Sequence, residues 1–280
     1  MTRRSSRRRT ESKQEGHHKK IKASTPSNQE DAFGACPENC HHTHILTHNT
    51  PADLDTHDSS KQSKIIFATH SSSLLQIQET DVQLAVLRPN NQTDVRAVLA
   101  DPSHPLTSLP TYEGLVSIYD ATSRLNSFLN PRYPLRSKSN RALNDHQMTD
   151  FIQEMNDLIQ VFAEITGSEF VHVNLHIVHD DGCSLWHQDC VDNRLITTYR
   201  GACTEYVLPQ YSTNTLLQKS QNSPHAQSLL QGDVAIFKGR GETLEGEELL
   251  FQPGIVHRSP RYSGERLVLI LDIPQEGWHY

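Results

Sequence analysis

Polar positions dominate the first sixty residues of the chain, and periodic apolar positions begin only after them. Residues 1–62 are rich in Ser, Thr, Asn, His and charge, and they show neither a helical nor a strand period. Such a segment has too little apolar surface to offset the entropy lost on ordering it. We therefore expect a disordered N-terminal tail over 1–62, followed by one globular unit over 63–280.

Helical spacing prevails in the first part of the globular unit, residues 63–167. A strand is expected at Asp81–Arg88, where alternate positions are apolar. Apolar residues spaced three and four apart predict two or three helices: a short candidate at Val95–Leu99, a second at Tyr112–Leu129 and, most clearly, Thr149–Ile165. Gly167 ends the third helix, because glycine tolerates left-handed backbone geometry.

After Gly167 the apolar period changes from 3.6 to 2, which predicts a β-rich half over 168–280. The expected strands are Val171–Val178, Arg194–Tyr199, Glu205–Leu208, Val234–Phe237, Leu249–Phe251 and Arg266–Ile273. Short strands without helical segments between them favour a sandwich, jelly roll or barrel. The fold class is therefore α+β.

Charge is divided between the tail and the globular unit. Residues 1–22 are strongly basic, whereas the whole chain of 280 residues has a net charge of −7. An acidic body is not a nucleic-acid-binding surface, so only the tail can touch polyanions, and without specificity. No apolar run approaches the roughly 18 residues of a membrane span, and no apolar signal-peptide segment follows the basic N-terminus. We expect a cytoplasmic protein with neither membrane nor specific nucleic-acid partners.

Five cysteines, an odd number in a long chain, favour reduced thiols over a disulfide framework. Two of them lie with four histidines in the cluster Cys36–His48. Zinc accepts such ligands, but their spacing fits no standard zinc finger, and flexible His-rich tracts bind metal weakly. A chance cluster is the preferred interpretation, and a zinc site is the alternative.

A second set of candidate ligands lies in the β half. His187 and Asp189 stand two positions apart, so a strand would place both on one face. His257 follows a Pro-Gly turn and can complete a set of three ligands. Two imidazoles and one carboxylate suit non-haem Fe(II), because they leave three adjacent positions open, and zinc accepts the same groups. A lone His-x-Asp is expected by chance among 17 histidines, so the prediction depends on His257.

Three further residues are candidates for binding a carboxylate. Arg266 opens the last apolar strand, where its guanidinium can pair with the distal carboxylate of a dicarboxylate cosubstrate. Arg194 and Tyr199, on the strand after Asp189, can line the same pocket. Their alternatives are a surface or ion-paired arginine and a core tyrosine.

The order of these motifs resembles the jelly-roll core of 2-oxoglutarate and Fe(II) dependent dioxygenases, especially the prolyl-hydroxylase-like branch, over about residues 170–273. The chain also resembles, over about 75–275, a mainly bacterial family catalogued as a domain of unknown function, whose genes often stand among zinc-starvation genes. The residues that carry this second resemblance are Arg194–Gly201, Thr204–Glu205, Gly232–Gly239 and His257–Pro260.

The first resemblance implies a helical part, 63–167, packed on a C-terminal double-stranded β-helix, 168–280. It also implies a metal site that holds Fe(II), or zinc, through three residues: His187, Asp189 and His257. Arg266 would bind 2-oxoglutarate, whose decarboxylation to succinate accompanies oxidation of a C–H bond in a small-molecule or protein substrate. The substrate and the oligomeric state stay open. The alternatives are a non-catalytic zinc-binding or zinc-homeostasis protein that uses the same site, and a metal-free binding module.

Overall fold

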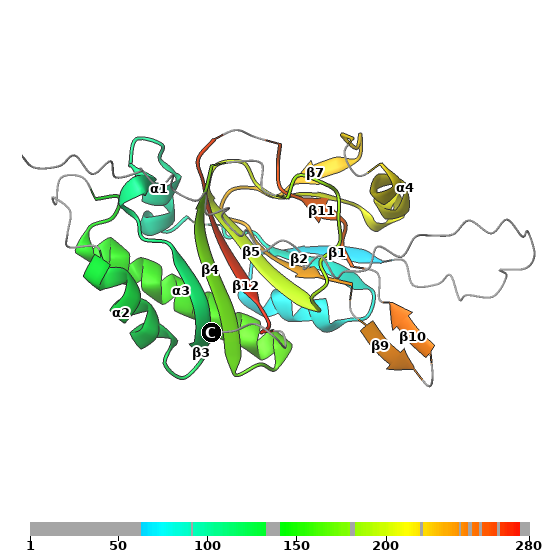
Figure 1. Ribbon diagram of the computed structural model, residues 1–280, viewed down its shortest axis with the longest axis horizontal. Helices are drawn as coiled ribbons and strands as arrows, with labels where there is room; N and C mark the ends of the chain where they lie inside the picture. The colour runs from blue at the N-terminus through cyan, green and yellow to red at the C-terminus, as the bar shows by residue number, and fades with distance from the viewer. Residues whose placement is uncertain are drawn as a thin grey trace, which may run out of the picture. The chain divides into compact units, whose positions relative to one another are not determined.

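The computed structural model of the protein (Figure 1) describes the chain from residue 63 onward, apart from short gaps. The described residues are 63–90, 92–132, 141–179, 183–218, 221–240, 242–245, 248–251, 254–261 and 264–274. The expected tail over 1–62 and the Cys36–His48 cluster lie outside them. All described residues belong to one compact unit.

A seven-stranded mixed sheet forms the centre of this unit (Figure 1). Its order is β1 (Lys64–Ala68), β2 (Val82–Leu87), β8 (Val234–Lys238), β5 (Asn193–Arg200), β12 (Arg266–Asp272), β4 (Phe170–Val178) and β3 (Tyr112–Ser117). Only β1 and β2 run parallel, and every other neighbouring pair is antiparallel. Strands from both halves of the chain, before and after Gly167, therefore share one sheet.

A smaller sheet packs on one face of this large sheet. It consists of β11 (His257–Arg258), β6 (Glu205–Val207) and β7 (Ala226–Ser228). A second apolar cluster joins the two sheets: Tyr206 of β6 is buried in it with Phe237 of β8 and Val268 of β12. The hairpin of β9 (Glu242–Glu245) and β10 (Glu248–Phe251) forms a separate two-stranded sheet.

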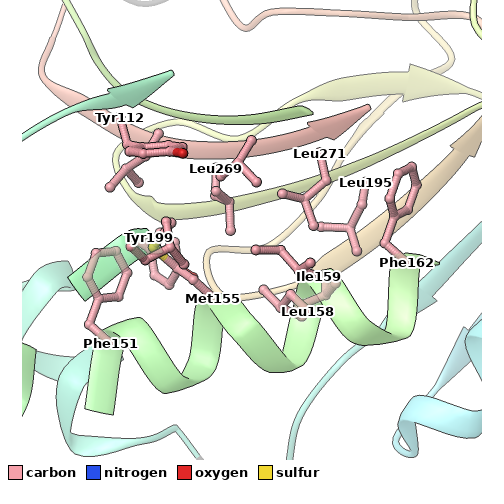
Figure 2. Close-up of a cluster of buried hydrophobic side chains, with 14 of the residues drawn as sticks. Tyr112, Phe151, Met155, Leu158, Ile159, Phe162, Leu195, Tyr199, Leu269 and Leu271 are labelled. Atoms are coloured by element: carbon pink, nitrogen blue, oxygen red, sulfur yellow. The ribbon is translucent and has the colours of Figure 1, made fainter. Parts of the chain in front are cut away.

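Helices cover the opposite face of the large sheet. The longest, α3 (Asp145–Thr166), packs its apolar face on β5 and β12 (Figure 2). Figure 2 shows the facing side chains, Phe151, Met155, Leu158, Ile159 and Phe162 from α3 with Leu195, Tyr199, Leu269 and Leu271 from the sheet. On the same face lie α1 (Asp94–Ala100) and α2 (Ala121–Arg132), whereas α4 (Ser212–Leu217) lies beside the smaller sheet (Figure 1). Short 3-10 turns occur at Ser71–Gln78, Leu106–Ser108 and Pro209–Tyr211.

Local sequence signals define both ends of α3. The Asn144 side chain accepts a hydrogen bond from the backbone N–H of Gln147, whose own side chain accepts from the backbone N–H of Asn144. Gly167 caps the C-terminus with φ 67°, in the left-handed region. The helix therefore ends where its sequence predicts and begins four residues before the expected Thr149.

Both faces of the central strands are buried, which explains their nearly continuous apolar sequences. Along β5, Leu195 faces the helices and Ile196 faces the smaller sheet. Along β12, Leu269 and Leu271 pack under α3, whereas Val268 packs in the second cluster. Each of these side chains contributes roughly 1.5–3 kcal/mol through burial. The sheet thus separates a helix-covered core from a second face that carries polar residues.

The expected helix over Tyr112–Leu129 is wrong in its first third. Residues 112–117 form the edge strand β3, and α2 begins only at Ala121. β3 pairs antiparallel with β4, and this pairing buries Tyr112 and Val116 on one face. Gly114 weakens a helix interior, so strand pairing outweighed the helical spacing that the segment also shows.

The expectation that no helical segment interrupts the strands after Gly167 is wrong, because α4 lies between β6 and β7. The protein is a mixed helix and strand structure, and the β-rich half follows Gly167 as predicted. Short strands that the sequence did not reveal are β1, β7, β9 and β11. None of the described helices has an apolar stretch long enough to cross a bilayer.

Candidate metal centre

Two candidate ligands are brought together by an isolated β-bridge. His187 pairs antiparallel with His257 at the start of β11, and each donates its backbone N–H to the carbonyl of the other at 3.0 Å. In such a pair, the two side chains project from the same side of the ladder. Their ring centroids are accordingly 4.5 Å apart.

Asp189 is fixed by the backbone around it. Its carbonyl accepts a hydrogen bond from the backbone N–H of Arg240 at 2.7 Å, and the neighbouring Gln188 donates its side-chain amide to Gly254 O, also at 2.7 Å. Gly239 permits this close packing, because a Cβ there would lie 1.7 Å from Val191 O and 2.9 Å from Asp189 O. The glycine thus positions the segment that carries the carboxylate.

The three side chains converge on one point. One ligand atom from each of His187, Asp189 and His257 lies within 4.8 Å of the others, and in the described part of the chain this is the group that could hold a metal. His257 Nε2 is 3.3 Å from Asp189 Oδ2, and His187 Nε2 is 3.7 Å from Asp189 Oδ1. Adjacent ligands at about 2.1 Å from one ion are roughly 3 Å apart, so small adjustments close the set around a metal.

Hydrogen bonds also select the ring nitrogens that face the carboxylate. Nδ1 of His187 lies 2.8 Å from Leu185 O, and Nδ1 of His257 lies 3.2 Å from Ile255 O. A carbonyl only accepts, so each Nδ1 must carry the proton. Each neutral imidazole then presents the lone pair of Nε2 toward Asp189, which is the form that a metal requires.

Asp189 stays ionised despite its burial. Burial by itself would raise the pKa of this carboxyl, but its interactions with the His257 imidazole and with the Arg194 guanidinium outweigh that cost and hold the pKa well below its ordinary value. Arg194 Nη1 donates to Asp189 Oδ1 at 2.7 Å. Asp189 Oδ2, in contrast, is buried and accepts no well-aligned hydrogen bond from the described residues.

These residues fit a metal ion. An orphaned buried carboxylate oxygen costs free energy unless a cation or a donor satisfies it. Asp189 Oδ2 is such an atom, and two imidazole nitrogens with fixed tautomers lie beside it. Asp189 and His257 are almost fully buried, whereas His187 retains about a quarter of its side-chain exposure. The site is therefore partly exposed on the side of His187.

Arg266 lies on the same face of β12 as Val268 and Asp272, the face that carries the site. Its guanidinium is buried, and Nε donates to Ala202 O at 2.7 Å. Arg266 lies six positions before Asp272, which is about 20 Å along a strand. No described hydrogen bond or ion pair joins Arg266 to the three candidate ligands, and apolar side chains of the second cluster fill the same face of the sheet.

The other two candidates for carboxylate binding, Arg194 and Tyr199, lie on opposite faces of the large sheet. Arg194 reaches the site and contacts Asp189. Tyr199 instead lies in the helix-covered core (Figure 2). Its ring is edge-on to that of Phe151, with ring centroids 5.2 Å apart, and its centroid is 5.4 Å from the guanidinium carbon of Arg96. The structure therefore corrects the expectation that Tyr199 lines the pocket, because alternation along β5 turns it to the opposite face of the sheet from Arg194.

Other polar residues near the site take varied positions. His172 and His176 of β4 alternate with core residues, so they face away from α3 as expected, and they lie half-buried on the face of the sheet that carries Arg266 and Asp272. Burial lowers the pKa of both imidazoles. Cys183 places its Sγ 3.6 Å from His187 Nδ1.

The cysteines only partly follow the expectation of reduced thiols. Cys183 is free and exposed, and Cys203 is free and buried. Cys190, however, is disulfide-bonded, so the expectation does not hold for every cysteine.

Sequence reasoning missed one residue that contacts the site. Asp272, at the end of β12, is paired with Arg194 through two hydrogen bonds of 2.7 and 3.0 Å. A signal was present, because Asp272 interrupts the apolar run Leu267–Ile273, and a carboxylate in a buried strand needs a partner. The identity of that partner could come only from the pairing of β12 with β5.

Comparison with protein families assigns the chain to one of them. The family model described as "Protein of unknown function (DUF1826)" matches residues 68–272, which is most of the chain. The protein therefore belongs to this family. A search of curated proteins gave no match.

Solved structures with similarity to this chain include dioxygenases and complexes with 2-oxoglutarate. The rice dioxygenase for auxin oxidation has 10% identity and a TM-score of 0.38, covering 75% of this chain and 82% of its own. The dioxygenase for auxin oxidation from Arabidopsis thaliana, in a binary complex with 2-oxoglutarate, has 13% identity and a TM-score of 0.36, with coverages of 77% and 94%. A full-length protein from Neurospora crassa, in complex with alpha-KG, has 10% identity and a TM-score of 0.31, with coverages of 77% and 85%.

Proposed function

We propose that this protein is a non-haem Fe(II) oxygenase that uses 2-oxoglutarate as cosubstrate. The observation that carries the proposal is the convergence of His187, Asp189 and His257, whose ligand atoms lie within 4.8 Å of one another. Two imidazoles and a carboxylate on one side of an ion are the ligand set of mononuclear Fe(II) oxygenases. Bound Fe(II) and 2-oxoglutarate together would supply the activation of dioxygen for oxidation of a C–H bond.

The ligand roles follow from the hydrogen bonds of each residue. His187 and His257 would bind through Nε2, because each Nδ1 is committed to a backbone carbonyl. Asp189 would bind through Oδ2, because Oδ1 already accepts from Arg194. One atom from each of the three residues would hold the ion, and a cosubstrate that binds through two oxygens would take positions that they leave open.

The sheet topology supports an interpretation as a double-stranded β-helix. In the large sheet the order β8-β5-β12-β4 is antiparallel throughout, and in the smaller sheet β11 lies between the bridge residue His187 and β6. Two antiparallel sheets that face each other with connections alternating between them form a jelly roll. In this interpretation, the three ligands lie at one end of the space between the sheets.

Arg266 is the residue that we propose for the distal carboxylate of 2-oxoglutarate. Its side chain, with 3% exposure, lies on the inner face of β12 and is positioned by the carbonyl of Ala202. A guanidinium carries five N–H donors in a planar fork that matches a carboxylate. A dicarboxylate bound at the metal through one end would require such a cation at the other end. The apolar neighbours Ile196 and Val268 would exclude water between the two ends.

The test is an anaerobic titration of Fe(II)-loaded protein with 2-oxoglutarate, followed by the visible charge-transfer absorption of the chelate. We expect the band to develop to saturation, and to be absent from the Asp189→Ala variant. Protein that binds Fe(II) without developing the band would contradict the oxygenase assignment. Tight zinc binding at the same three residues, again without the band, would favour a non-catalytic zinc-binding protein instead.

A further inference from the structure

The carboxylate of Asp189 is held by an arginine that is itself held by a second carboxylate. Arg194 donates from Nη1 to Asp189 Oδ1 at 2.7 Å. Its Nε and Nη2 donate to the two oxygens of Asp272, at 2.7 and 3.0 Å. The planar guanidinium therefore joins both carboxylates in one rigid arrangement.

This arrangement stands on the central strands of the molecule. Arg194 and Asp272 are direct neighbours in the antiparallel register of β5 and β12, near the middle of the seven-stranded sheet. The side chains of Asp272 and Asp189 are 6% and 7% exposed, and that of Arg194 is 20% exposed. Asp272 holds two of the three guanidinium nitrogens, Nε and Nη2, from the neighbouring strand. The position of the third nitrogen, Nη1, which donates to Asp189, is thereby fixed.

We propose that Arg194, anchored by Asp272, is a positioning residue that orients Asp189 for the metal. By occupying Oδ1, the guanidinium turns the carboxylate so that Oδ2 faces His257 Nε2, at 3.3 Å. The carboxylate is thereby restricted to one coordinating oxygen, and the remaining positions around the ion stay open. This inference rests on the proposed metal site and extends it to two residues that are not among its three candidate ligands.

Coulomb repulsion and a positioning role predict opposite effects of removing Arg194 on the affinity for a metal. A guanidinium beside a cation site disfavours cation binding, so its removal should tighten the binding of a metal. A positioning role predicts weaker binding, because partners that orient a metal ligand typically contribute 10–100-fold in metal affinity. The direction of the change in affinity therefore distinguishes the two roles.

The experiment measures the dissociation constant of Co(II), with its visible spectrum as a probe of the coordination geometry, in full-length protein. The main variant is Arg194→Met/Asp272→Asn, which keeps the net charge of the site and avoids leaving Asp272 as a buried carboxylate without its arginine partner. We expect its Co(II) dissociation constant to rise about tenfold or more, with an altered visible spectrum. Arg194→Lys keeps the charge but loses the fork, and we expect its affinity to fall as well.

A matched control removes a comparable pair elsewhere. Arg96 and Glu154 form a buried ion pair of 2.8 Å on the helix-covered side of the sheet. Arg96→Met/Glu154→Gln also exchanges one buried arginine and one carboxylate for neutral residues. We expect it to lose stability while its Co(II) affinity stays within about threefold of the wild-type value. Circular dichroism of each variant establishes that the proteins compared are folded.

Several results would overturn the inference. One is an unchanged Co(II) affinity and spectrum, or tighter Co(II) binding, in Arg194→Met/Asp272→Asn. The others are a wild-type affinity in Arg194→Lys and no binding of Co(II) by the wild type. The proposed function is tested separately. If the wild type binds Co(II) and the variants weaken it, but 2-oxoglutarate never binds to the Fe(II) protein, the oxygenase assignment fails and the positioning role of Arg194 stands.

Discussion

Phe237 packs its ring against the imidazole of His257, with ring centroids 4.7 Å apart. The same imidazole faces the ring of His187 on another side and is tied through Nδ1 to a carbonyl. Phe237 is fully buried and lies opposite Arg194 in the pairing of β8 with β5. The large sheet thus positions both the ring that presents one candidate ligand nitrogen and the arginine that contacts the Asp189 carboxylate.

Replacing either imidazole should abolish metal binding without unfolding the protein. For wild-type protein, a metal at one hundred times its dissociation constant should add about 2.7 kcal/mol to the free energy of unfolding, because it binds only the folded state. His187→Ala and His257→Ala should lose this gain, which thermal denaturation with and without Co(II) measures. His176→Ala is the control, since His176 is a half-buried histidine outside the ligand set. Variants that retain the full gain would show that the ligand assignment is wrong.

Arg266 and Tyr199 should differ in their effect on 2-oxoglutarate. Arg266→Met should keep the metal but weaken the cosubstrate by about 1.5–3 kcal/mol, the contribution of a charge-assisted hydrogen bond, or roughly 10- to 150-fold in affinity. Tyr199→Phe should change that affinity less than about twofold, because Tyr199 lies in the helix-covered core. Anaerobic titration of the Fe(II) protein measures both. An equal loss of 2-oxoglutarate affinity in the two variants would contradict the placement of Arg266 and Tyr199 on opposite faces of the sheet.

Alanine at two glycines should have unequal consequences. Gly167→Ala meets no atom within 4 Å, so it should cost only the strain of a left-handed residue, about 1 kcal/mol. A Cβ at Gly239 would lie 1.7 Å from Val191 O, so Gly239→Ala must displace the backbone that carries Asp189. We expect a several-fold larger loss of stability in urea denaturation, together with weaker Co(II) binding. Equal costs at the two sites would refute this role of Gly239.

The two free thiols should differ in reactivity. Burial raises the pKa of the Cys203 thiol from 9.0 to about 11, whereas Cys183 is exposed. Iodoacetamide at about pH 8 should therefore alkylate Cys183 in the folded protein and Cys203 only after denaturation, as peptide mass spectrometry can establish. Because the raised pKa belongs to the folded state, this thiol favours folding below about pH 9, and the contribution is lost as the pH rises toward 11. Rapid alkylation of Cys203 in the native protein would contradict this prediction.

The sequence by itself determined the elements whose signals are local. The helix α3 has an apolar face at helical spacing, a capping box at Asn144 and a glycine at its end, and these agree with one another. The strands β4, β5, β8 and β12 were likewise predictable from runs of apolar residues between turn signals. The spacing of His187 and Asp189 indicated a candidate metal site, but the expected strand is absent, because His187 forms an isolated β-bridge and Asp189 lies in the loop after it.

Tertiary structure alone decided which faces and partners these elements use. Both faces of β5 are buried, so its apolar sequence does not indicate which face carries the site. The sequence analysis therefore assigned Tyr199 to the same pocket as Arg194, although alternation along the strand puts the two side chains on opposite faces. Residues 112–117 became a strand because β4 offered an edge to pair with, which no local spacing reveals. The contact of Arg194 with Asp189 and Asp272 joins residues up to 78 positions apart, and their proximity exists only because β12 lies beside β5 in the folded sheet. Local propensity does not determine which distant strands pair, so the contacts of Arg194 at the site could not be predicted from the sequence.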